Sequence, residues 1–223
     1  MKECENMIKA ILFDFDGTLA DTNPLIIRTF KETFATLLTD RAISEAEILN
    51  CIGPTLEQTG AKYFPENPDG FVATYREFNS KYHDEMIKVY PGIIEMVRVL
   101  KEKGLKLAIV SSKRRDFVIR GLQQTGLVQF FDYIVAADDV KKPKPDPEPI
   151  EKAMQHYGIT TAECLMVGDN EHDIHGAKNA KVKSIAVGWA IKGVDYLKAL
   201  NPDYLVMDTM EIVKIVEAIN NDH

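Results

Sequence analysis

IKAILFDFDGTL, residues 8–19, is the stretch that decides the fold. It begins with an apolar run that is long enough for one buried strand and too short for a helix. Asp14 and Asp16 follow this run, and residues i and i+2 of an extended chain point to the same side. Two carboxylates about 4 Å apart repel by roughly 4 kcal/mol at an effective dielectric of about 20. We therefore expect a shared proton, a cationic side chain or a metal beside them. All-oxygen ligands favour Mg²⁺ over Zn²⁺.

Gly17 and Thr18 come directly after this acidic pair. Glycine lets the chain turn sharply and lets a ligand approach the backbone closely. A solvated turn is the alternative interpretation, because Asp and Gly favour turns. A strand followed by Asp-x-Asp-Gly-Thr is more specific than an Asp-Gly pair alone, so the pattern favours a binding or catalytic site.

The composition is that of an ordinary globular protein, with 45% hydrophobic and 27% charged residues. A length of 223 residues allows one large domain, or one domain with a modest insert. The formal charge of −7 argues against nucleic acid or an anionic membrane surface as the main partner. Monomer and homodimer both remain open.

The cysteines predict a reducing compartment. Cys4, Cys51 and Cys164 form no CxxC pair and are odd in number, which is typical of free thiols. The sequence shows neither an apolar run of membrane-spanning length nor a signal-peptide pattern. We therefore expect a cytoplasmic protein.

Residues 18–87 read as a helical insert, and we expect no strand between about residues 21 and 88. Ser44 and Glu47 form a capping-box pattern at the start of one short helix. Apolar residues at helical spacing and breaker residues predict helices over 22–38, 45–51, 56–63 and 70–86.

Strands and helices alternate from residue 88 onward. Strands are expected at 105–110, 133–137, 163–167, 184–187 and 204–206, and helices at 93–103, 113–124, 150–157, 173–180 and 210–220. This alternation predicts an α/β fold, a doubly wound parallel sheet that comprises residues 1–17 and 88–223. Ligands of such sheets bind beyond the carboxyl ends of the strands.

Ser111 and Ser112 follow the strand expected at 105–110. A serine at this place can cap the next helix. The same hydroxyl and free backbone N–H groups can instead bind phosphate oxygens. Taken alone, the residues favour the cap.

Two lysines stand in the proline-rich segment 141–149. Prolines pre-set the backbone beside a lysine, so its ammonium can be delivered to a fixed point. A solvated linker or a docking peptide is the alternative. Lys142 and Lys144 both compete for a role at the site.

Gly168-Asp169-Asn170-Glu171-His172-Asp173 follows the strand at 163–167. Asp173 fits a helix start, where acidic residues complement the macrodipole. Asp169, directly after a buried strand, favours a functional role. No zinc spacing supports His172 and His175 as ligands, so we expect both on a solvated helix face.

These four elements together resemble the motifs of the haloacid dehalogenase (HAD) superfamily phosphatases. The pattern is Asp-x-Asp-Gly-Thr, a serine at a strand end, Lys-Pro-x-Pro and Gly-Asp-x-x-x-Asp. The resemblance covers nearly the whole chain, with residues 18–87 where the family carries a helical cap. Tyr90-Pro91-Gly92 and Val167-Gly168-Asp169 are similar to phosphoglycolate phosphatases and to a related pyrophosphatase branch. Ala180-Lys181 departs from the pattern, since relatives carry glycine after the alanine, and predicts a strained helix end.

The resemblance implies a Mg²⁺-dependent phosphatase that acts on a small phosphorylated metabolite, such as phosphoglycolate, or on pyrophosphate. Asp14 would be the nucleophile and form an aspartyl-phosphate, and Asp16 would be the acid and base. The implied metal ligands are Asp14, the Asp16 carbonyl, Asp169 and, through water, Asp173. The implied phosphate and substrate contacts are Gly17, Thr18, Ser111, Ser112, Lys144 (preferred to Lys142 by its spacing), Gly53 and Thr55.

Three alternatives remain open. A phosphomutase of the same fold would return the phosphoryl group to a sugar. A non-catalytic module would bind a phosphorylated ligand without turnover. A halide-releasing hydrolase is opposed by Asp169 and Asp173, because that chemistry needs no metal.

Overall fold

The central sheet is parallel throughout, as the sequence predicts. The computed structural model describes residues 7–38 and 41–221. Six strands are ordered β5-β4-β1-β6-β7-β8, and every neighbouring pair is parallel. Their bounds are β1 (Ala10–Phe13), β4 (Lys106–Val110), β5 (Tyr133–Val135), β6 (Cys164–Gly168), β7 (Lys183–Val187) and β8 (Tyr204–Val206).

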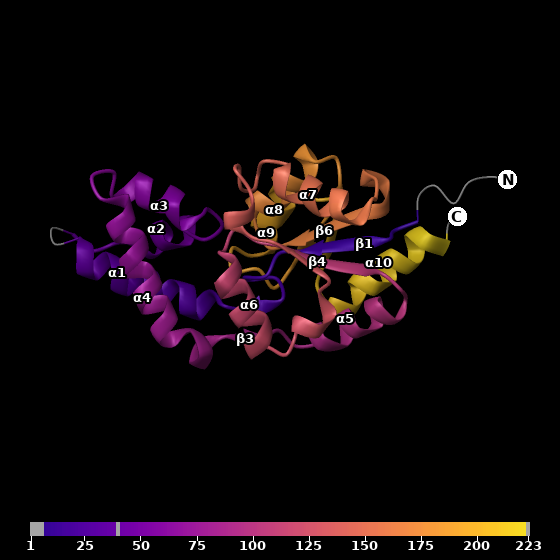
Figure 1. Ribbon diagram of the computed structural model, residues 1–223, viewed down its shortest axis with the longest axis horizontal. Coiled ribbons are helices and arrows are strands. Elements are labelled where there is room, and N and C mark those ends of the chain that lie inside the picture. Colours follow the sequence, from indigo (N-terminus) through magenta and orange to yellow (C-terminus); the bar gives the residue numbers. More distant parts are fainter. Residues whose placement is uncertain (1–6, 39–40, 222–223) are drawn as a thin grey trace.

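Helices cover both faces of this sheet (Figure 1). Ile11 and Phe13 of β1 join one hydrophobic cluster, and Leu12 joins the other, as the two-residue period of a strand requires. The first face packs against α5 (Ile93–Glu102), α6 (Arg115–Gln124) and α10 (Thr209–Asn221). The second packs against α7 (Glu148–Tyr157), α8 (Glu171–Asn179) and α9 (Val194–Ala199). β1 is therefore buried on both sides.

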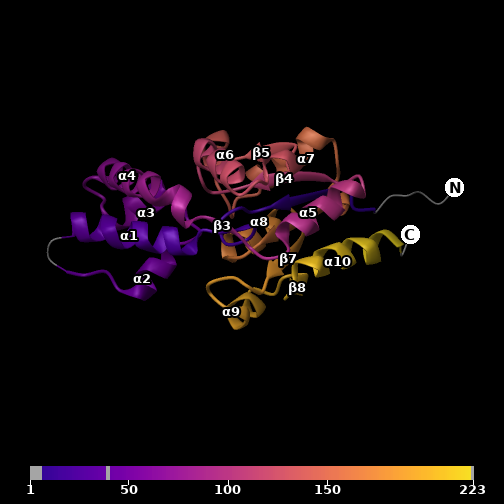
Figure 2. The same ribbon diagram turned by 90° about the horizontal axis from the view of Figure 1, so that it is seen from below.

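A second group of helices lies beyond the carboxyl ends of the strands (Figures 1 and 2). We call it the cap; it consists of α1 (Asn23–Leu37), α2 (Glu45–Asn50), α3 (Leu56–Tyr63) and α4 (Pro68–Met86). The cap has its own aromatic core, in which Phe30, Phe34, Phe71 and Tyr75 pack together. The capping box expected at the start of α2 is confirmed.

A two-stranded antiparallel ribbon joins the cap to the sheet domain. β2 (Ala20–Asp21) pairs with β3 (Lys88–Val89) where the chain leaves the sheet domain and returns. This ribbon was not predicted, because strands of two residues show no periodicity. Leu19, Ala20 and Leu25 pack in the core under the sheet, so the cap separates a few residues later than the predicted boundary after Gly17.

Other differences lie at element ends. Helix α6 begins at Arg115 rather than 113, and α8 begins two residues earlier than expected. Helix α9 and three short 3-10 helices, η1 (Val128–Phe130), η2 (Ala137–Asp139) and η3 (Thr161–Glu163), were not predicted. The strain expected at Ala180-Lys181 is present, because Lys181 has a φ of 58°.

Two further expectations concern the compartment. Within residues 7–38 and 41–221, no helix has both the length and the apolar character to cross a membrane. Cys51 and Cys164 are free, buried thiols. Cys4 lies outside the described residues.

Candidate active site

Three neighbouring strands deliver the predicted site residues to one place. Asp14 follows β1, Ser111 follows β4 and Asp169 follows β6, and these strands are adjacent in the sheet. Carboxylate oxygens of Asp14, Asp169 and Asp173 lie within 4.8 Å of one another. All three carboxylates are buried. We call these three residues the acidic cluster.

Lys144 lies inside the acidic cluster. Its Nζ donates to Asp14 Oδ1 at 3.0 Å, to Asp173 Oδ1 at 2.6 Å and to the Val110 carbonyl at 2.7 Å. Lys142 is exposed, and its Nζ lies 3.9 Å from Asp146. Of the two competing lysines, the structure therefore brings Lys144 to the site.

The loop after β6 is held by the start of α8. Asn170 is the N-cap of this helix, and Asp173 completes the capping box. Asp173 Oδ2 accepts from the backbone N–H groups of Asp169 and Asn170, both at 3.2 Å. A Cβ at Gly168 would lie 2.2 Å from the Asp173 Cβ, so only glycine fits there. Asp173 thus positions both the lysine and the Asp169 backbone.

Gly17 is required where it stands. Its φ of +79° favours glycine, and a Cβ there would lie 2.2 Å from Asp169 Oδ2. The backbone after β1 can therefore approach the carboxylate after β6 closely. This contact explains the glycine of the Asp-x-Asp-Gly-Thr stretch.

The acidic cluster carries more negative charge than Lys144 neutralises. Burial raises the pKa of Asp14 to about 7, with repulsion by Asp173 and Asp16 adding to the shift and Lys144 opposing it. Burial and the neighbouring carboxylates also raise the pKa of Asp169 well above its usual value. Asp169 Oδ1 accepts from the Asn170 amide at 2.8 Å. Buried, closely spaced carboxylate oxygens are a donor set that fits a hard divalent cation.

Asp16 has a partner that the sequence analysis missed. Lys113 Nζ lies 2.8 Å from Asp16 Oδ1, and both side chains are mostly buried. The available signal was the position of Lys113, two residues after the strand-end Ser111. We treated that segment as a helix start, so the lysine was not considered.

Ser111 does not cap the following helix. The N-cap of α6 is Arg114, three residues further along the chain. Ser111 Oγ accepts from the Lys113 backbone N–H at 3.2 Å, and the Ser111 hydroxyl lines a cavity beside Asp14. The helix-cap alternative is therefore wrong, and the hydroxyl is placed where it can meet a ligand.

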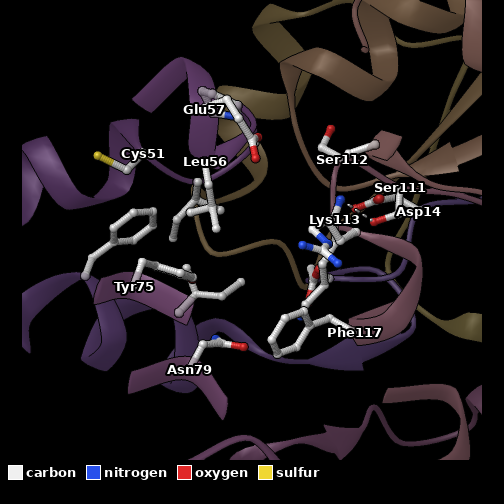
Figure 3. A pocket seen from close by; sticks show the side chains of 18 of the residues that line it. Asp14, Cys51, Leu56, Glu57, Tyr75, Asn79, Ser111, Ser112, Lys113 and Phe117 are labelled. Carbon is white, nitrogen blue, oxygen red and sulfur yellow. Dashed lines mark hydrogen bonds and ion pairs between the residues drawn. The ribbon is translucent and has the colours of Figure 1, made fainter. Parts of the chain in front are cut away.

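This cavity lies between the cap and the sheet domain and has an empty volume of about 840 Å³, part of it open to solvent. Figure 3 shows Asp14, Ser111 and Lys113 on its sheet-domain side, and Leu56, Tyr75 and Asn79 on its cap side. The polar residues are gathered at the strand ends, and much of the cap side is apolar.

The remaining predicted contacts divide into two groups. Gly53 and Ser112 line the cavity. Thr18 and Thr55 do not: Thr18 is fully buried, and the Thr55 hydroxyl accepts from the Gln58 N–H as the N-cap of α3. Thr55 was predicted as a contact because residues 52–55 resemble the substrate-facing turn of the family's cap, but its hydroxyl caps α3 instead.

The expectation that His172 lies on a solvated helix face was wrong, although it holds for His175. The His172 side chain is 15% exposed, and its Nδ1 lies 3.2 Å from the Lys144 carbonyl. A Cβ on Gly53 would lie 2.8 Å from His172 Cδ2, so this histidine stands where the cap meets the sheet domain.

Comparisons with known proteins agree with this geometry. The chain is 46% identical over 209 residues to the pyrophosphatase PpaX of Halalkalibacterium halodurans, covering 94% of this chain and 97% of that protein. The PpaX of Listeria monocytogenes is 44% identical over 209 residues, covering 94% and 96%. The crystal structure of a predicted phosphatase from Clostridium acetobutylicum superimposes with a TM-score of 0.83 at 28% identity, covering 95% of this chain and 99% of that chain.

The family match spans the same motifs. Residues 11–187 match the family described as haloacid dehalogenase-like hydrolase. The matched range contains Asp14, Ser111, Lys144 and Asp169. The chain therefore belongs to the haloacid dehalogenase-like hydrolase family.

Proposed function

We propose that this protein is a Mg²⁺-dependent phosphatase that hydrolyses pyrophosphate through an aspartyl-phosphate on Asp14. The observation that carries the proposal is the position of Asp14. It lies beside Lys144 and the other two carboxylates of the acidic cluster, and it lines a cavity that a small anion can enter. The relative from Halalkalibacterium halodurans, which matches nearly end to end, supports pyrophosphate as the substrate.

In the first step, an oxygen of the Asp14 carboxylate attacks the phosphorus. The new O–P bond forms as the bridging P–O bond breaks, and the leaving phosphate takes the electron pair together with a proton from Asp16. In the second step, water attacks the acyl phosphate, and its proton passes to Asp16. The Asp14 carboxylate is regenerated, and the second phosphate is released.

Ser111 and Lys144 hold the transferring oxygens. The Lys144 ammonium lies 3.0 Å from Asp14, so it can bridge the nucleophile and the phosphoryl group. Ser111 is adjacent and offers its hydroxyl. Mg²⁺ held by Asp14, Asp169, the Asp16 carbonyl and, through water, Asp173 would supply the positive charge that lets an anionic ester approach a carboxylate.

A phosphoglycolate-like monoester is the second candidate. One observation favours an organic group in the substrate: Ile26, Phe30 and Leu56 of the cap and Phe117 of α6 line the cavity. An apolar wall of this kind can pack against carbon atoms, whereas pyrophosphate has none.

The free thiols bear on the compartment. Cys51 and Cys164 are buried and unpaired with each other. Such thiols are typical of proteins in a reducing environment, and we propose that the protein acts in the cytoplasm.

A panel of substrates tests the function. Phosphate release is measured from pyrophosphate, phosphoglycolate, a sugar phosphate and a nucleoside monophosphate, after chelation and with Mg²⁺ restored. We expect the highest kcat/KM for pyrophosphate, and only with Mg²⁺. Release from none of these compounds would overturn the proposal, and isomerisation of the sugar phosphate without release would indicate a phosphomutase.

A further inference from the structure

The cavity contains polar groups that the proposed chemistry does not use. Figure 3 shows Tyr75 and Asn79 of α4 on the cap side and Lys113 on the sheet-domain side, all beyond Asp14. In an in-line displacement, the leaving group departs away from the nucleophile. The space beyond Asp14, toward the cap, is where that group would lie.

The Asn79 amide is a buried donor in the cavity wall. Asn79 is 2% exposed, and among the described residues its Nδ2 meets no acceptor that satisfies hydrogen-bond geometry. The Tyr75 hydroxyl, one turn earlier on α4, lies close to this amide: burial and Asp16 raise the pKa of Tyr75, and the Asn79 amide opposes the shift. A buried amide donor whose neighbouring acceptor is poorly aligned is unfavourable, so its retention in a cavity wall points to a better acceptor supplied by a ligand.

Lys113 supplies positive charge at the opposite wall. Its Nζ lies 2.8 Å from Asp16, the residue proposed to protonate the leaving oxygen, and its side chain is 15% exposed. The two arginines that line the cavity are differently placed: Arg76 pairs with Glu57 at 2.8 Å, and Arg114 with Asp116 at 3.2 Å. Lys113 is therefore the cavity cation next to the proposed acid and base.

We propose that Asn79 and Lys113 bind the leaving group and favour one that carries anionic oxygen atoms. This inference rests on the proposed function and deepens it. The second phosphate of pyrophosphate presents oxygens that accept from the Asn79 amide and pair with the Lys113 ammonium. The alkyl part of a simple ester offers neither an acceptor to the Asn79 amide nor a charge to the Lys113 ammonium, which would then keep only its pairing with Asp16 among the described residues.

Inhibition of 4-nitrophenyl phosphate hydrolysis tests this site without requiring pyrophosphate turnover. Methylenediphosphonate occupies both phosphate positions and is not hydrolysed, whereas inorganic phosphate occupies the position beside Asp14. We expect Asn79→Leu and Lys113→Met each to raise the inhibition constant of methylenediphosphonate at least about tenfold. The constant for inorganic phosphate should change less than about threefold.

Two further variants guard against misfolding. Asn79→Asp keeps the shape of the side chain and adds a negative charge, so it should weaken methylenediphosphonate more than Asn79→Leu does. Lys101→Met removes a lysine that pairs with Asp132, outside the cavity, and should leave both inhibition constants unchanged. Circular dichroism and thermal unfolding verify that each variant is folded.

The outcomes separate the two proposals. Equal changes for both inhibitors, or none, in the folded Asn79 and Lys113 variants would overturn the leaving-group site. If the wild type hydrolyses esters but not pyrophosphate, the proposed substrate is wrong. The selective loss of methylenediphosphonate binding would then still support a site for an anionic leaving group.

Discussion

The two walls of the cavity differ in the chemistry of their side chains. The sheet-domain wall is a set of buried charges at the ends of β1, β4 and β6, in which Lys144 contacts Asp14 and Asp173. The cap wall is formed largely by apolar side chains, among them Phe30 of the aromatic core, with Tyr75 and Asn79 as polar groups. The sheet-domain wall therefore presents buried charges to a ligand, and the cap wall presents a mostly apolar surface.

This difference assigns separate tasks to the walls. Asp14 and Asp173 are firmly positioned, because Asp14 follows the paired strand β1 and Asp173 belongs to the capped start of α8. The cap is connected through the short β2–β3 ribbon and meets α6 through exposed ion pairs such as Arg120–Asp84 at 2.9 Å. We therefore expect the chemistry to depend on the sheet domain, and the shape of the accepted substrate to depend largely on the cap.

The strongest test of the sheet-domain wall is Asp14→Asn. We expect kcat for pyrophosphate to fall at least about 10³-fold, because the nucleophile is removed. The fold should persist, since Lys144 keeps its bonds to Asp173 and Val110. Phosphate release and circular dichroism measure the two properties, and wild-type turnover by the purified variant would contradict the nucleophile assignment.

Lys144→Met should have the largest effect on stability. It leaves the carboxylates of the acidic cluster buried without their cation, which should cost about 3–5 kcal/mol at pH 7 in urea unfolding. Lys142→Met is the matched control, because Lys142 is exposed and its nearest carboxylate is 3.9 Å away. The control should change the free energy of unfolding by less than about 0.5 kcal/mol. Similar losses of unfolding free energy in the two variants would contradict the claim that buried Lys144 stabilises the acidic cluster.

Metal ions and protons should compete for the Asp14 carboxylate. The pKa of Asp14 is about 7 in the folded protein against an ordinary 3.8, so the folded, metal-free state holds a proton that the unfolded state releases. This group therefore stabilises the metal-free fold below about pH 4, and the contribution is lost as the pH rises through 7.

It follows that stabilisation by Mg²⁺ should grow with pH. We expect the increase in Tm caused by Mg²⁺ to be at least about 4 °C larger at pH 8 than at pH 5.5, because protons must leave before the metal binds. Thermal unfolding with and without Mg²⁺ measures this difference. Asp169→Asn should reduce the increase at both pH values, and an equal increase at both pH values in the wild type would argue against a carboxylate site.

The smallest expected effect concerns the contact between the walls. Gly53→Ala places a Cβ 2.8 Å from His172 Cδ2 at a φ of +117°, so it should cost about 1–2 kcal/mol and lower kcat/KM about tenfold. Gly104→Ala is the control, with a φ of +82° and nothing within 4 Å of the added Cβ. It should reduce stability without affecting kcat/KM, and equal kinetic losses would show that the Gly53 contact is unimportant.

The parallel sheet and the convergence of its strand ends were predictable, because buried strands and the turns after them have short-range signals. The order of the strands in the sheet was not predicted and comes from the structure. Asp14, Asp169 and Lys144 were located in this way, and the structure brings them together. The end of the cap was less predictable, since Leu19 and Leu25 are as apolar as the cap residues and only packing shows which core they join.

By itself, the sequence determined which residues carry charge at the strand ends, because each stands immediately after a locally recognisable strand or before a helix. Only the tertiary structure decided that Lys113 pairs with Asp16 and that the Asn79 amide lies in the cavity wall. Lys113 and Asp16 are 97 residues apart in the chain, and Asn79 faces the cavity only through the packing of the cap. Such contacts depend on how distant segments of the chain pack together in the folded protein. The periodicity of the sequence within one segment does not indicate that packing.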